Sequence, residues 1–205
     1  MNTNVSGHQS ANPITCAGHS LLHRTRRTVL KLAVATTIGT GLLGISACST
    51  IDPAIYVNEK PKFDLKSYFN GTVDAWGVVT DRNGKVIKRF SVVLDCKWDG
   101  DTGVLDESFT YADGTKDKRI WTLKKNGDRY IGTAADVVGE ATGIASGNAL
   151  LWSYTMALPV DGKIYNVKFE DWMFLMDDET MINRAEMRYF GVKTGEITLS
   201  FRKRK

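Results

Sequence analysis

The sequence predicts an all-β fold, an up-and-down antiparallel barrel of about ten strands that follows an N-terminal signal peptide. Three observations lead to this fold. From Gly71 onward, apolar and polar residues alternate with the period of two that is typical of strands. No long stretch of helical period interrupts this alternation. Turn dipeptides that favour hairpins divide it into segments: Asn83-Gly84, Asp99-Gly100, Asp113-Gly114, Asn126-Gly127 and Asp161-Gly162.

The first 47 residues have the features of a signal peptide. They contain four basic residues, no Asp or Glu, and an apolar stretch from about Val29 to Ile45. This stretch is short and rich in Gly and Thr for a spanning helix, which needs about 20 mostly apolar residues. It ends at Ile45-Ser46-Ala47-Cys48, which resembles the lipobox of bacterial lipoproteins. The resemblance implies cleavage before Cys48, lipid on the sulfur of that cysteine, and a membrane as the partner of the lipid anchor.

Two further motifs concern the destination and the export route. Ser49 follows the cysteine, and in Gram-negative lipoproteins a residue other than Asp there implies the periplasmic leaflet of the outer membrane. The segment 25–31, with adjacent Arg26 and Arg27, resembles a twin-arginine export signal. A general-secretion signal with two neighbouring arginines explains the same residues, so both export routes remain open.

The remaining chain divides into a tether and one domain. Residues 48–66 comprise the lipidated cysteine and a tether, because Pro53 and Pro61 accompany a stretch without sustained period. A helical turn is expected at 65–69. Residues 67–205 are long enough for a single β-barrel domain with its own core. The candidate strands lie near 71–81, 85–98, 103–112, 116–125, 128–137, 140–147, 149–159, 163–175, 180–190 and 195–203.

Composition excludes several classes of function. Four of the 27 basic residues lie in 1–47, so the mature chain carries 23 basic against 23 acidic residues and offers no excess for nucleic acid. All three histidines precede Cys48, which excludes a Ser-His-Asp triad and histidine-ligated zinc. Cys96 is the single remaining cysteine and has no disulfide partner. We therefore expect no metal and no cofactor, and we favour a non-enzymatic role over carboxylate-based catalysis.

A meander of this many twisted strands tends to close, because closure removes unpaired strand edges. This favours a lipocalin-like (calycin-type) barrel over a two-sheet sandwich. Since successive side chains in a strand point to opposite faces, the alternation also assigns residues to the interior. The candidate ligand-binding residues obtained in this way are Glu107, Tyr111, Arg119, Trp121, Asp136, Trp152, Tyr154, Asp171 and Asn183.

The predicted interior has one arginine and several carboxylates, which need partners when they are buried. In one interpretation Arg119 bridges Asp171 and Glu107 and the network is structural. In the other, Arg119 and the tyrosines receive the polar head of a lipid or fatty-acyl ligand, whose tail lies along aromatic residues. A third interpretation is an envelope scaffold, for which exposed Trp76 and Trp172 would be the signature.

Several segments also resemble a known family. They include Tyr68-Phe69-Asn70-Gly71, Glu107-Ser108-Phe109-Thr110-Tyr111-Ala112-Asp113-Gly114, Arg119-Ile120-Trp121, Asp171-Trp172-Met173 and Ile182-Asn183-Arg184. Together they are similar to the signature of an uncharacterised family of proteobacterial lipoproteins, a domain of unknown function, over essentially all of 68–203. The resemblance implies a lipoprotein with one barrel domain and supplies no established catalytic residues.

Overall fold

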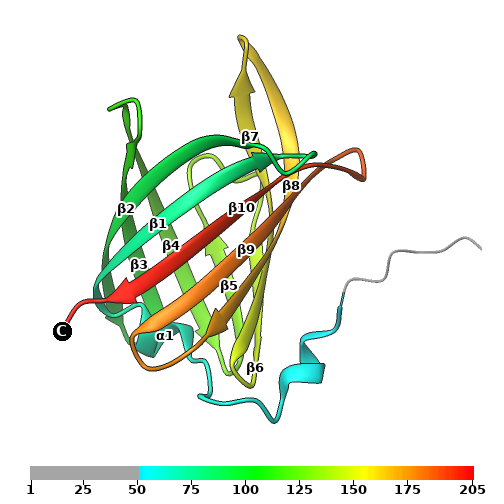
Figure 1. Ribbon diagram of the computed structural model, residues 1–205. Helices are drawn as coiled ribbons and strands as arrows, with labels where there is room; N and C mark the ends of the chain where they lie inside the picture. Colours follow the sequence, from blue (N-terminus) through cyan, green and yellow to red (C-terminus); the bar gives the residue numbers. More distant parts are fainter. Residues whose placement is uncertain (1–50) are drawn as a thin grey trace, which may run out of the picture. The chain divides into compact units, whose positions relative to one another are not determined.

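Ten antiparallel strands close into a barrel in which each strand pairs with its neighbours along the chain. The structure is a computed structural model that describes residues 51–205 (Figure 1). The signal peptide expected over 1–47 and the expected lipidation site, Cys48, lie outside these residues. The strands are β1 (Gly71–Asp81), β2 (Val86–Asp99), β3 (Thr102–Tyr111), β4 (Lys116–Asn126), β5 (Arg129–Thr133), β6 (Ala141–Ser146), β7 (Ala149–Val160), β8 (Lys163–Leu175), β9 (Thr180–Tyr189) and β10 (Val192–Lys203).

Closure occurs between the first and the last strand. β10 pairs with β1 from Val73 opposite Lys203 to Asp81 opposite Gly195, so the barrel has no free edge. The predicted lipocalin-like barrel of about ten antiparallel strands is thereby confirmed. All strand partners and the hydrophobic core lie within 51–205, and this segment therefore contains what an independently folding domain needs.

The alternation and the turns explain the meander. In β8, Val167, Phe169 and Asp171 are buried, whereas Lys168 between them is exposed. At the β7–β8 turn, Asp161 and Gly162 have φ of 50° and 76°. A two-residue hairpin turn that matches strand twist requires positive φ at both central positions, which Asp-Gly tolerates.

The fifth strand is shorter than the predicted 128–137. β5 ends at Thr133, and residues 134–140 leave the sheet apart from a single bridge between Val137 and Met156. The backbone N–H of Val138 donates to the Thr155 carbonyl at 2.8 Å, so this loop stays attached to β7. Asp136 therefore reaches its position from a loop and not from a strand.

A helical turn closes one end of the barrel, as Figure 1 shows near the start of β1. The turn expected at 65–69 is present as α1 (Leu65–Tyr68), with Asp64 as N-cap accepting from the Ser67 N–H at 2.8 Å. Four side chains of this region are buried in the hydrophobic core at the closed end of the barrel: Phe63, Leu65, Tyr68 and Phe69. The hydroxyl of Tyr68 donates to the Glu179 carbonyl at 2.9 Å, and this bond ties the turn to the residue before β9.

Part of the expected tether belongs to the folded domain. A short 3-10 helix, η1 (Pro53–Tyr56), packs against β6 and β7. The backbone N–H of Phe63 donates to the Gly147 carbonyl at 2.7 Å. A side chain at position 147 would collide with the Tyr56 carbonyl, so glycine is required for this close approach. The structure thus differs from the boundary at 66/67, since hydrophobic burial of Phe63 recruits the preceding segment. Neither helix in 51–205 has the length and hydropathy needed to cross a membrane.

Candidate functional site

A cavity of about 120 Å³ lies inside the barrel. Its apolar wall is formed by residues from α1 and from most of the strands, among them Leu65, Phe69, Phe90, Leu105 and Leu199. Its polar groups come from five different strands: Glu107, Arg119, Tyr154, Asp171 and Asn183. Helix α1 closes one end of the barrel. The cavity is the part of the barrel interior next to α1 that side chains leave unfilled.

Arg119 on β4 is held mainly by Asp136. Its Nε and Nη2 donate to the Asp136 Oδ2 at 3.0 and 2.8 Å, a two-point contact that suits the planar guanidinium. Its Nη1 lies 3.7 Å from the Glu107 Oε2. Burial by itself would lower the pKa of Arg119, but the Asp136 hydrogen bond and the charge of Glu107 outweigh it and raise this pKa above its ordinary value. The expected ion pair between Arg119 and Glu107 is present, whereas the expected bridge to Asp171 is replaced by Asp136.

Glu107 on β3 faces the cavity opposite Arg119 in the strand register. Burial of this carboxyl raises its pKa to about 7, although the charge of Arg119 acts in the other direction. No residue in 51–205 donates a hydrogen bond to it, and the contact with Arg119 is longer than a hydrogen bond. The Glu107 oxygens are thus available to a group in the cavity.

Asp171 on β8 has different partners. Its Oδ1 accepts a hydrogen bond from the Asn183 side-chain amide, and its Oδ2 lies 3.5 Å from the Tyr154 hydroxyl, which donates. Burial raises the pKa of Asp171 to about 6, and these two hydrogen bonds counteract that effect. Burial and the neighbouring Asp171 charge also raise the pKa of Tyr154 well above its ordinary value, so this phenol stays protonated.

Aromatic rings form the wall beside these polar groups. Trp121 meets Trp152 and Tyr154 edge to face, with ring centroids 5.6 and 5.5 Å apart. Tyr154 stacks on Phe169 at 4.9 Å with nearly parallel planes. Edge-to-face and stacked pairs of this kind stabilise each other beyond simple burial. The rings therefore pack against one another around the unfilled space.

The structure brings seven of the nine sequence-predicted residues together on the cavity wall. Tyr111 lies instead near the β3–β4 turn, stacked on Phe109 and with the Lys88 ammonium 4.7 Å from its ring centre. Asp136 approaches the barrel from the loop and touches Arg119 without lining the cavity. Within the part of the chain that the structure describes, no group of His, Cys, Asp and Glu side chains is placed to hold a metal ion.

Sequence reasoning missed the contribution of the segment before β1. Leu65 and Phe69 line the cavity, although the first was assigned to the tether and neither was among the predicted interior residues. A signal was available, because Asp64 and Ser67 form a helix start between apolar residues. The missing information was where the turn would dock.

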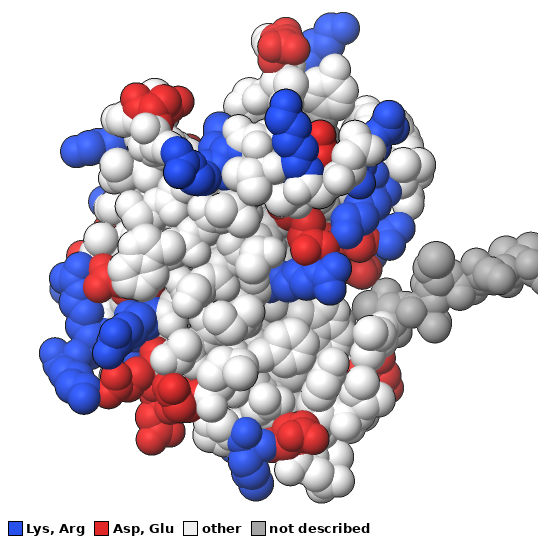
Figure 2. Space-filling view, viewed as in Figure 1, with Lys and Arg blue, Asp and Glu red and all other residues white. Residues whose placement is uncertain are grey.

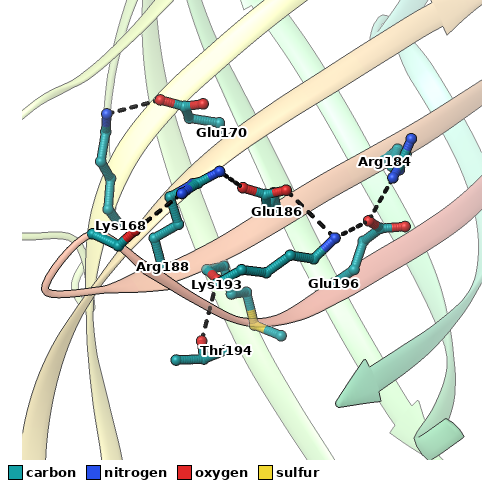
Figure 3. A network of polar contacts seen from close by, with 10 residues as sticks. Lys168, Glu170, Arg184, Glu186, Arg188, Lys193, Thr194 and Glu196 are labelled. Atoms are coloured by element: carbon teal, nitrogen blue, oxygen red, sulfur yellow. Dashed lines mark hydrogen bonds and ion pairs between the residues drawn. The ribbon is translucent and has the colours of Figure 1, made fainter. Parts of the chain in front are cut away.

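A second group of charged residues lies on the outer surface of β8, β9 and β10. Figure 3 shows that acidic and basic side chains alternate there, so each charge is matched. The ion pairs are Lys168–Glu170, Arg188–Glu186, Lys193–Glu186, Lys193–Glu196 and Arg184–Glu196. Exposed pairs of this kind contribute little stability individually. The network borders a shallow outer hollow that Ile51, Trp172 and Phe190 also line.

The face shown in Figure 2 carries charged side chains mostly at its margins, with a broad uncharged area between them. Trp76 on β1 is 53 % exposed, as expected for an outward position. Trp172, in contrast, is only partly exposed, because it packs edge-on against Tyr56 of η1 at 5.6 Å and stacks on Phe174. Of the two tryptophans expected to mark a protein-binding surface, only Trp76 has a largely solvent-exposed side chain.

Comparisons with known proteins give a family and a fold. A protein of unknown function of the DUF3598 family from Nostoc punctiforme PCC 73102 superposes with a TM-score of 0.50 at 13 % identity, over 71 % of this chain and 51 % of that chain. This chain thus spans about half the length of that structure, and at such identity the likeness concerns the fold alone. An S-type phycobiliprotein lyase, CPES, from Guillardia theta gives a TM-score of 0.49 at 5 % identity, over 68 % of this chain and 91 % of that chain.

No curated protein matches the sequence. The family described as "Protein of unknown function (DUF3833)" matches residues 42–203, which is most of the chain including the entire barrel. This chain belongs to the DUF3833 family.

Proposed function

We propose that this protein is an exported, lipid-anchored protein of the cell envelope whose barrel binds a small amphipathic ligand. The observation that carries the proposal is the cavity of about 120 Å³ between aromatic rings and hydrogen-bonding groups. Protein cores are normally packed with few voids larger than a water molecule. Ligand sites combine an apolar wall with a small number of polar groups, and this cavity has that composition.

The volume limits the class of ligand. It is close to the roughly 150 Å³ of an engineered cavity that binds benzene. It is below the roughly 300–1,000 Å³ of sites for drug-sized ligands. A lipid with two acyl chains does not fit in such a space. The ligand we propose has one apolar tail, as a fatty-acyl compound has, and its remaining atoms leave through the end opposite α1.

The anchor we propose is lipid on Cys48, in the periplasmic leaflet of the outer membrane. Two residues separate Cys48 from Ile51, and the three residue steps between them span roughly 11 Å at most. Ile51 borders the outer hollow beside Arg184, Arg188 and Phe190. Lipid attached at Cys48 would therefore hold the outer face of β8 and β9 next to the membrane, where arginine and aromatic side chains suit the headgroup region.

Intrinsic fluorescence can test ligand binding, because Trp121 and Trp152 line the cavity. Octanol titrated into residues 49–205 should change their emission saturably. Ala185→Leu places a larger side chain into the cavity wall and should abolish the change. Thr198→Leu, on the outer face of β10, is the matched control and should bind octanol normally. An unchanged, folded wild-type protein at saturating octanol would contradict the proposal.

One observation favours a second candidate function, binding of a protein partner in the envelope. Trp76 on β1 is 53 % exposed on the outer surface of the barrel. Large exposed apolar areas mark interaction sites on soluble proteins. A Trp76→Ala variant that loses a specific crosslink in cells while retaining octanol binding would support this role.

A further inference from the structure

The charge of the ligand follows from which groups on the cavity wall are already engaged. Arg119 carries a positive charge on this wall, but other side chains already contact its guanidinium group. Two of its nitrogens donate to Asp136, the third faces Glu107 at 3.7 Å, and the Phe109 ring centre lies 5.5 Å from Cζ. An anionic head would have to displace a carboxylate from this arginine. The donor that we expected to receive such a head is therefore not available.

Hydrogen-bond acceptors, in contrast, remain free. Glu107 accepts no hydrogen bond from residues 51–205, and the long bond from Tyr154 leaves capacity on Asp171. The side-chain nitrogen of Asn183 donates both to Asp171 and to the Trp172 carbonyl. This orients the Asn183 Oδ1 away from Asp171, and that oxygen has no donor among the described residues. Asn183 is 1 % exposed and lines the cavity, so a donor placed in the cavity could bond to this oxygen.

We infer that the cavity of this barrel selects a protonated primary amine at the end of a single apolar tail. The inference rests on the proposed ligand binding and adds to it the charge and hydrogen-bonding class of the ligand. An ammonium group has three donors and no acceptor. It matches a wall with two carboxylates and a free amide oxygen, and it needs no displacement of Asp136 from Arg119.

Two further features of the site suit an ammonium group. The rings of Trp152 and Tyr154 line the cavity together with the polar groups, and aromatic faces attract cations within about 6 Å. The volume of about 120 Å³ admits the end of one chain. Quaternary ammonium groups share the charge but have no N–H to donate, so they should bind less well than a primary amine.

The affinity should rise with pH as the carboxylates lose their protons. Burial places the pKa of Glu107 at about 7 and that of Asp171 at about 6. The ionisable groups that act on these two carboxyls are Arg119 on β4, Asp136 in the loop, Asp106 on β3 and Tyr154 on β7. Arg119 and Tyr154 keep their protons over this range. Between pH 5.5 and 8 the wall therefore becomes more negative.

Four probes with the same chain test the inference on residues 49–205: octylammonium, octyltrimethylammonium, octanol and octanoate. Tryptophan fluorescence at pH 8 gives the dissociation constants. We expect octylammonium to bind about tenfold more tightly than octanol, as a charge-assisted hydrogen bond would give. Octanoate should bind more weakly than octanol, and the octylammonium preference should shrink at pH 5.5.

Isosteric variants identify the responsible groups. Glu107→Gln and Asp171→Asn should each reduce the preference of the cavity for octylammonium over octanol. Asp99→Asn, which removes an exposed carboxylate at the end of β2, should leave it unchanged. If a cavity variant does not fold, as far-UV circular dichroism would show, the wild-type pH profile decides instead.

The outcomes separate the inference from the proposed function. If octanoate binds as tightly as octylammonium, the inference is wrong and ligand binding stands. Equal affinity for octyltrimethylammonium and octylammonium would contradict the primary-amine assignment, and a preference independent of pH would exclude the two carboxylates as its source. If none of the four probes binds to the folded protein, both the inference and the proposed function fail.

Discussion

The partner of Arg119 can be identified by a double-mutant cycle. Arg119→Met keeps most of the side-chain stem and removes the charge. Breaking a fully buried ion pair costs about 3–5 kcal/mol. Here the side chains of Arg119, Asp136 and Glu107 are 22 %, 37 % and 14 % exposed, so Asp136 can recover part of its hydration. Glu107 can take up a proton because its pKa is about 7. We therefore expect a loss of about 2 kcal/mol.

The loss can be measured by urea denaturation or thermal unfolding of residues 49–205. For a domain of this size, about 2 kcal/mol corresponds to a fall in Tm of about 4–8 °C. Lys124→Met, an exposed lysine on the same strand, is the matched control and should change stability by less than about 0.5 kcal/mol.

The cycle then tests which carboxylate is coupled. Arg119→Met combined with Asp136→Asn should show a coupling free energy of about 1–2 kcal/mol, because both partners of the two-point contact are removed together. Arg119→Met combined with Asp171→Asn should be additive to within about 0.5 kcal/mol, since Asp171 bonds to Asn183 and Tyr154. Stronger coupling to Asp171 than to Asp136 would refute the reasoning and restore the pairing expected from the sequence.

Three further predictions concern pH, membrane attachment and packing. Burial raises the pKa of Glu107 from 4.5 to about 7, so between these values the folded state holds a proton that the unfolded state has lost. The free energy of unfolding should fall as pH rises through this range. Glu107→Gln should remove about 3 kcal/mol of that fall, measured by urea denaturation at pH 4.5 and 8. Cys48→Ser should shift the protein from the membrane to the soluble fraction on cell fractionation, and retention in the membrane would contradict the anchor. Gly143→Ala places a Cβ 2.5 Å from the Trp152 ring and should cost about 1–3 kcal/mol in thermal unfolding, whereas Thr142→Ala on the outer face should cost less.

The inward-facing set of residues could be predicted from the sequence because side-chain direction in a strand is local. The turns place Arg119, Trp121 and Leu123 on one strand and on the same face of it. Because Lys124 on the opposite face must contact solvent, these three side chains point into the barrel. The same argument placed Glu107 and Asp171 inside the barrel correctly. It failed at Asp136, where the chain leaves the sheet after Thr133 and alternation no longer applies.

The pairing of the interior charges could not be predicted in the same way. Which carboxylate reaches Arg119 depends on the path of the 134–140 loop across β7. Two hydrogen bonds fix this path: the Val138 N–H donates to the Thr155 carbonyl, and the Ala157 N–H of β7 donates to the Asp136 carbonyl. It also depends on Asn183, which engages Asp171 from the adjacent strand. These contacts join residues on different strands and loops, so they cannot be predicted from the local sequence pattern.

The sequence by itself determined that the chain after Gly71 alternates, turns back at its Asn-Gly and Asp-Gly pairs, and buries aromatic and ionisable residues together. These properties arise within a few residues of each position, through the strand period and the backbone freedom of the turn residues. Only the tertiary structure decided that Phe63 to Phe69 close one end, that Asp136 neutralises Arg119, and that the space above Leu65 stays unfilled. Those outcomes depend on how side chains from six or more strands fill a common volume, which is set by closure of the barrel and by the packing of its interior.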